Sequence, residues 1–138
     1  GSELSGGVEN IFVDNCTVLD NADIFNLVFI KTNERRGGYA KNIFVQNIEA
    51  DTLKKSVLGI ETDVLYQWRS LVPTIEKRLT SIANVHLSNI KVGKAKHVSQ
   101  IIGDTAFPIN NVVLNNIVVD ALEEQKFNNE NVTNFIEN

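Results

Sequence analysis

The nine-residue stretch Asn10-Ile-Phe-Val-Asp-Asn-Cys-Thr-Val18 decides the fold, because it recurs along the chain. Three further copies and a degenerate echo follow, at residues 42–50, 84–92, 111–119 and 131–133. The leading asparagines are separated by 32, 42, 27 and 20 residues. Unequal periods of this kind are typical of a solenoid whose units share strands and differ in their loops.

The apolar positions within the stretch predict a bend. Ile11 and Val13 are two apart, as are Cys16 and Val18, so each pair points to one side of a strand. The step from Val13 to Cys16 is three, which would turn a straight strand inside out at Asn15. Asparagine tolerates the left-handed backbone region and suits a sharp bend there. We expect the same bend, and ladders of stacked side-chain amides, at the equivalent asparagines: Asn47, Asn89 and Asn116.

The repeat predicts an all-β chain folded as a right-handed parallel β-helix of about four to five coils. Further β-like runs lie between the motifs, at Leu27–Lys31, Ser56–Glu61 and Val98–Ile102. Each coil would hold three short strands, two from the motif and one from such a run, giving three parallel sheets. The rival architecture is an antiparallel sandwich, which an in-register motif disfavours.

We expect residues 1–138 to form a single domain with two additions. Residues 63–80 are too long for a tight turn and form an inserted loop carrying Tyr66 and Trp68. This loop either lines a binding face or covers a sheet or an end of the stack. Residues 120–138 are expected to cap the last coil, with Leu122–Phe127 as a short helix or a loop.

Composition argues against several functions. The net charge is −4 without a basic stripe, which disfavours nucleic-acid binding. No apolar run approaches the roughly 18 residues of a membrane span. A lone Cys16 and two distant histidines, His86 and His97, predict no metal site and no cofactor. We expect both histidines at surface or loop positions.

Three short segments carry a resemblance to a known family. Gly1-Ser-Glu-Leu-Ser-Gly-Gly7 is similar to a GSE-x-SGG turn that leads into a coil. Phe29-Ile-Lys31 resembles an RIK strand, and Arg36-Gly-Gly-Tyr39 resembles an RGGY turn. Their order and spacing resemble the C-terminal part of family 28 glycoside hydrolases, the polygalacturonase-like enzymes, in their bacterial branch.

The resemblance implies hydrolysis of pectin on a β-helix, with inversion at the anomeric carbon. Such hydrolysis needs two carboxyl groups separated by room for a water. The family's Asn-Thr-Asp, Asp-Asp and Gly-His-Gly motifs do not occur in the 138 residues, so no catalytic residue is identified. The chain would be the C-terminal portion of such an enzyme, inactive alone. The resemblance also implies a secreted or periplasmic location and an acidic plant polysaccharide (galacturonan or rhamnogalacturonan) as partner.

The expected substrate-binding residues are Lys31, Arg35, Arg36, Tyr66 and Trp68. The resemblance implies that Lys31 pairs with a substrate carboxylate. Phe29 stands where the family has arginine, which removes a bidentate partner for an acidic sugar. The alternative is that these basic residues are solvated surface residues that bind no substrate.

Two other functions stay open, a non-catalytic carbohydrate-binding module and a structural β-helix. An uncapped N-terminal coil would leave its core and strand edges exposed, so we also predict a homodimer through that end.

Overall fold

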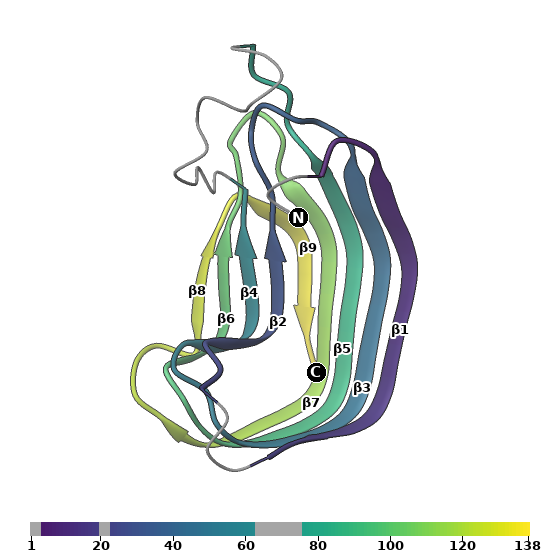
Figure 1. Ribbon diagram of the computed structural model, residues 1–138. Coiled ribbons are helices and arrows are strands. Elements are labelled where there is room, and N and C mark those ends of the chain that lie inside the picture. The colour runs from purple at the N-terminus through teal and green to yellow at the C-terminus, as the bar shows by residue number, and fades with distance from the viewer. Residues whose placement is uncertain (1–3, 20–22, 63–75) are drawn as a thin grey trace.

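The computed structural model describes residues 4–19, 23–62 and 76–138 of the chain (Figure 1). These residues form strands without any helix. The strands are β1 Gly7–Val18, β2 Asn26–Lys31, β3 Tyr39–Thr52, β4 Ser56–Glu61, β5 Ser81–Ala95, β6 His97–Ile102, β7 Ile109–Leu122, β8 Phe127–Glu130 and β9 Val132–Glu137.

The chain alternates between two parallel sheets that face each other (Figure 1). The five-stranded sheet has the order β1-β3-β5-β7-β9, and the four-stranded sheet has the order β2-β4-β6-β8. Each strand from β1 to β7 therefore pairs with the strand two later in sequence, always in parallel. This all-β arrangement is consistent with a β-helix-like fold, and the antiparallel rival is wrong for the described residues.

The copies of the nine-residue motif lie in register, as the sequence predicts. Ile11 pairs with Ile43, Ile43 with Val85 and Val85 with Val112. These side chains point into the space between the two sheets, where the buried core lies. The runs predicted between the motifs are β2, β4 and β6, with bounds within one residue of expectation.

Asparagine makes the bends, as predicted from the slip in the apolar pattern. Asn15, Asn47, Asn89 and Asn116 have φ between 52° and 56°. All ten non-glycine residues with positive φ in the described ranges are asparagines. The leading asparagine of each motif, such as Asn10 with φ 58°, is a second left-handed position that the apolar pattern did not reveal.

The stacked asparagines form the predicted amide ladders. Asn89 Nδ2 donates to Asn47 Oδ1 at 3.2 Å and Asn116 Nδ2 to Asn89 Oδ1 at 3.0 Å. The leading asparagines form a parallel ladder, in which Asn42, Asn84 and Asn111 each donate to the preceding copy at 2.9–3.0 Å. Both ladders have one polarity, because each amide nitrogen points toward the N-terminal neighbour.

The number of sheets differs from expectation, since three were predicted and the described residues form two. The reason is that the left-handed asparagine bends the motif strand without interrupting its pairing. In β3 the pairs with β5 continue on both sides of Asn47, at Gln46↔Ser88 and Ile48↔Ile90.

The expectation for the histidines is wrong in part. His97 opens β6 and is 4% exposed. Its Nδ1 lies 2.7 Å from the carbonyl oxygen of Gln125, and its Nε2 lies 3.3 Å from Glu124 Oε2. Polar partners from a later loop therefore make its burial tolerable. His86 lies on β5, half-buried against the ring of Phe44.

The C-terminal residues extend both sheets. Strand β7 runs through Leu122, residues 123–126 form a loop, and β8 and β9 follow. The rings of Phe127 and Phe135, one from each sheet, meet edge to face at 5.2 Å and pack against the core. Beside them Lys126 Nζ bonds Glu137 Oε1 at 2.7 Å. These aromatic rings close the core at the C-terminal end.

Candidate functional site

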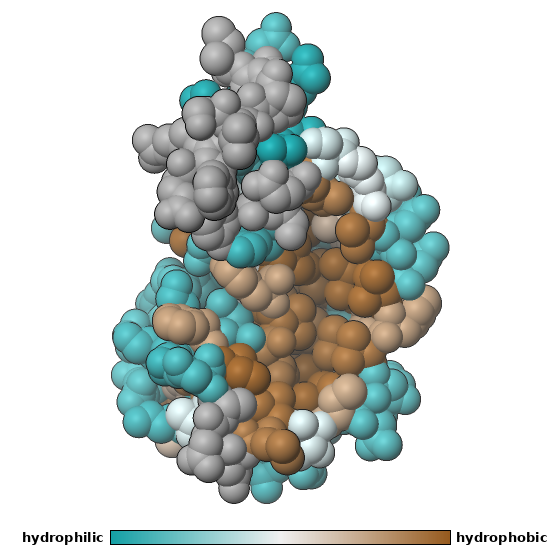
Figure 2. Space-filling model, viewed as in Figure 1, coloured by the Kyte–Doolittle hydropathy of each residue, from teal (hydrophilic) through white to brown (hydrophobic). Residues whose placement is uncertain are grey.

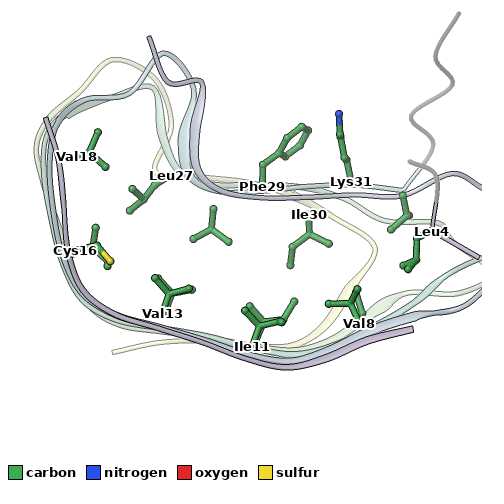
Figure 3. Close-up of a pocket in the computed structure, with 16 residues that line it drawn as sticks. Leu4, Val8, Ile11, Val13, Cys16, Val18, Leu27, Phe29, Ile30 and Lys31 are labelled. Carbon is green, nitrogen blue, oxygen red and sulfur yellow. The ribbon is translucent and has the colours of Figure 1, made fainter. Parts of the chain in front are cut away.

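The N-terminal end of the core is open. Figure 2 shows a band of hydrophobic residues lying between hydrophilic rims at this end. A cavity of about 460 Å³ is lined there by Leu4 and by residues of β1, β2 and β3. In Figure 3, Ile11, Val13, Cys16 and Ile30 point into it.

The cavity is an interrupted core and lacks the polar groups of a sugar-binding site. Along one register column the exposed fraction is 40% at Ile11, 8% at Ile43 and 0% at Val85 and Val112. The residue type barely changes along this column. The exposure of Ile11 therefore comes from its place at the sheet edge.

Lys31 lies at the end of β2, on the outer face of the four-stranded sheet. Figure 3 shows Phe29 and Lys31 pointing away from the cavity, whereas Ile30 between them points in. This is the alternation of a strand with one buried face. Lys31 therefore lies on the side of the four-stranded sheet that faces away from the core.

The neighbouring strands continue this face in two rows. Phe29 is in register with Gly59, Gln100 and Asn128. This row therefore has an aromatic ring on β2, no side chain on β4, and side-chain amides on β6 and β8. Lys31 is in register with Glu61, Ile102 and Glu130. We name these eight residues the outer face. Its amides and charges have the chemistry to bind hydroxyl and carboxylate groups of a polysaccharide. Gln100 and Glu61 were not singled out from the sequence, although the aligned ends of the three β-like runs would have indicated them.

Glu61 changes the electrostatics around Lys31. It follows Lys31 in register, and its Oε1 lies 3.7 Å from Lys55 Nζ. An acidic ligand at Lys31 therefore meets a carboxylate one strand away as well as two lysines. Binding of a polyanion would be weakened by that carboxylate, and more so at low salt, where charges are less screened.

Arg35 and Arg36 lie in the turn after β2. Arg35 Nε is 3.9 Å from Glu34 Oε1, and its backbone bridges to Arg78. Arg36 Nη1 donates to Ser5 Oγ at 3.3 Å. The structure thus places both arginines in a turn beside other backbone segments, while Lys31 stands on the outer face.

Two of the segments that carry the family resemblance meet in space. The amide of Tyr39 donates to the Gly6 carbonyl at 3.0 Å. A Cβ on Gly38, whose φ is +80°, would lie 1.9 Å from that same oxygen. A Cβ on Gly7 would lie 2.0 Å from Tyr39 Cζ. Gly7 and Gly38 are therefore explained by close contact of the two turns.

A charged cluster links turns that the sequence analysis did not connect. Lys77 Nζ lies 2.6 Å from Asp104 Oδ2 and 3.4 Å from Glu34 Oε2. The hydrogen bond from Lys77, and a second from the Ala106 amide, lower the pKa of Asp104. The same bond to Asp104, and a smaller effect of Glu34, raise the pKa of Lys77. The three residues are far apart in sequence, so no local pattern could have revealed them.

The other two expected binding residues, Tyr66 and Trp68, lie outside the described residues, as does most of the inserted loop. Within residues 4–19, 23–62 and 76–138, no three His, Cys, Asp or Glu side chains come together in a way that could hold a metal ion. The same ranges contain no helix of the length and apolarity that a membrane crossing requires.

No protein-family model matches this chain, and no curated protein matches it.

Proposed function

We propose that this chain is the C-terminal β-helix portion of a pectin-type polysaccharide hydrolase and that alone it binds acidic polysaccharide without cleaving it. In this proposal the two parallel sheets are the walls of a right-handed parallel β-helix. The observation that carries it is the outer-face position of Lys31, in a chain whose Ser5–Gly7 and Arg36–Tyr39 turns pack together.

The proposed ligand is a galacturonan or rhamnogalacturonan segment lying across the strands of the outer face. Lys31 would pair with a galacturonate carboxylate, and Gln100 and Asn128 would bond sugar hydroxyls. Phe29 offers an apolar ring and no guanidinium fork, so recognition of each carboxylate rests on a point charge. The proposed location is secreted or periplasmic, as the resemblance implies.

Calorimetric titration with oligogalacturonides tests the binding. A charge-assisted hydrogen bond contributes about 1.5–3 kcal/mol, so Lys31→Ala should raise the dissociation constant roughly ten-fold or more. The matched control is Lys91→Ala, because Lys91 is an exposed lysine on β5 of the other sheet. It should bind as the wild type does.

A reducing-sugar assay on polygalacturonate and on rhamnogalacturonan tests the catalytic half of the proposal. No turnover is expected from the 138-residue chain, and clear turnover would refute its inactivity. Wild-type protein that fails to bind any acidic oligosaccharide would favour the alternative, a structural β-helix module.

A further inference from the structure

The outer side of the five-stranded sheet carries two rows of side chains that differ in chemistry. Strands β3, β5 and β7 lie between β1 and β9, so these rows cross the middle of the sheet (Figure 1). In β3 the buried Ile43 and Val45 alternate with residues that point away from the core. The register repeats this pattern in β5 and β7. We name the six outward residues the central patch: Phe44, Gln46, His86, Ser88, Val113 and Asn115.

One row of the central patch is apolar and aromatic. Phe44 is in register with His86, and His86 is in register with Val113. The centroids of the Phe44 and His86 rings are 5.1 Å apart. On the side of β1, the Phe44 ring stacks on Phe12 with the centroids 5.2 Å apart. Phe44 is therefore held between two rings, and the row forms an apolar ridge.

The other row is polar, and its side chains are not used by the protein. Gln46 is in register with Ser88, and Ser88 is in register with Asn115. Within residues 4–19, 23–62 and 76–138, these three side chains make no hydrogen bond or ion pair. The residues that follow Gln46 and Ser88 are Asn47 and Asn89, which bond to each other in the ladder. Amides and hydroxyls both donate and accept, so the polar row can bond a ligand in either sense.

A groove of about 310 Å³ lies between the two rows. It is lined by all six residues of the central patch together with Val45, Leu87 and Asn138. The side chains of Val45 and Leu87 are buried in the core, so the backbone of β3 and β5 forms the floor. The volume is at the lower end of the range for small-ligand sites. The groove therefore has one apolar wall, one hydrogen-bonding wall and room for a small ligand.

We infer that the central patch binds a short stretch of neutral saccharide running across β3, β5 and β7. A sugar ring has apolar C–H faces and a rim of hydroxyl groups, which match the two walls of the groove. Equivalent residues recur at the strand spacing of about 4.8 Å, which suits a ligand built from repeating units. This inference does not rest on the proposed function, because it concerns the other sheet and a different class of sugar.

The charges and the strand pairing disfavour other ligands. Among the described residues, the groove lining includes no lysine, arginine, aspartate or glutamate. It therefore has no lysine or arginine to pair with a galacturonate carboxylate or a nucleic-acid phosphate. Extended peptides commonly bind by adding to an exposed strand edge. The backbones of β3, β5 and β7 are already paired on both sides, so a peptide cannot bind here in that way.

NMR titration of the purified chain tests the inference, with cellotetraose, xylotetraose and β-1,4-galactotetraose as neutral probes. The chain has two histidines, so His86 reports on the groove and the buried His97 is an internal reference. At least one neutral tetrasaccharide should shift the ring signals of His86 and the side-chain amide signals of Gln46 and Asn115. The His97 signals should stay unchanged. Tetragalacturonate should leave the His86 signals unchanged, whether or not it binds elsewhere on the chain.

Alanine substitutions in the polar row test which groups bind. Gln46→Ala and Asn115→Ala should each raise the dissociation constant of the bound tetrasaccharide about three-fold, and together about ten-fold. The matched control is Gln125→Ala, because Gln125 is an exposed glutamine in the loop at residues 123–126. This control should bind as the wild type does.

The inference is overturned if none of the three neutral tetrasaccharides shifts the His86 signals, or if tetragalacturonate shifts them as strongly. It is also overturned if Gln125→Ala weakens binding as much as Gln46→Ala does. A mixture of unrelated heptapeptides is titrated in parallel. Shifts caused by the peptides and by no saccharide would assign the groove to a peptide and reject the saccharide.

Discussion

At the scale of single residues, asparagine combines two properties that no other side chain offers together at these bends. It accepts a positive φ at modest cost, and its amide has both a donor and an acceptor. Asn89 shows both properties. Its φ is 52°, its amide nitrogen donates to Asn47, and its amide oxygen accepts from Asn116. Backbone conformation and ladder bonding are therefore coupled in one residue.

Substitution of Asn89 separates these two contributions. Asn89→Ala keeps a Cβ at positive φ and loses both ladder bonds, so the free energy of unfolding should fall by about 2–4 kcal/mol. Asn89→Gly relieves the backbone strain and loses only the two ladder bonds. Its free energy of unfolding should therefore fall by about 1–2 kcal/mol. Urea denaturation measures both, and equal losses would show that conformation is not limiting.

The ion pair between Lys77 and Asp104 predicts a pH dependence with a defined sign. The pKa of Asp104 is lowered in the folded protein from the ordinary 3.8. The contribution of Asp104 to folding stability is therefore fully present above pH 3.8. It is lost as the pH falls through the lower folded value. The pKa of Lys77 is raised from 10.5, so its contribution holds below that pH and is lost as the pH rises through the folded value.

The variant Asp104→Asn should remove this part of the acid dependence. Thermal unfolding of the wild type and the variant should be followed from pH 7 to pH 2. The difference between their unfolding temperatures should narrow once Asp104 is protonated. The interpretation would be contradicted by a stability difference that stays constant over that range.

At the scale of elements, the contact between the Ser5–Gly7 and Arg36–Tyr39 turns depends on glycine. Gly38→Ala would bring a methyl group against the Gly6 carbonyl at a positive φ. We expect a loss of about 2–4 kcal/mol in the free energy of unfolding, from strain and from displacement of the turn. Gly6→Ala is the matched control, because a Cβ there has no atom within 4 Å. Chemical denaturation should find this control close to the wild type.

The strands were predictable because their signals are local. The alternation of Ile43 and Val45, followed by the slip to Ile48, indicates both the buried face and the bend. The left-handed Asn42 was missed because only the apolar phase was followed, although its recurrence was equally visible. The count of sheets was wrong because a bend was taken as a break.

The candidate site was predictable only in part. Lys31 is a binding residue predicted from a short motif, and the parallel register then defines its neighbours Glu61 and Ile102. Contacts such as Lys77 with Asp104 depend on how separate turns meet, which no spacing in the sequence encodes. The burial of His97 likewise depends on partners contributed by a distant loop.

At the scale of the whole molecule, the core is closed at one end and open at the other. Phe135 contributes to the closure through Phe127. Phe135→Ala should lower the free energy of unfolding by roughly 2 kcal/mol, less than the 3–5 kcal/mol of a fully buried ring. Phe12→Ala is the control on the outer edge, where the ring is 72% exposed, and calorimetry should show a smaller change.

The amide ladders also have a consequence for chemical ageing. Asparagine deamidates when the next backbone nitrogen attacks the side-chain carbonyl carbon, and it is among the heat-labile residues. In Asn42, Asn84 and Asn89 the oxygen accepts one ladder bond and the nitrogen donates another, which restricts rotation of the amide group. The ladder hydrogen bonds should therefore slow deamidation of these asparagines. Slow conversion to aspartate should begin at asparagines outside the ladders.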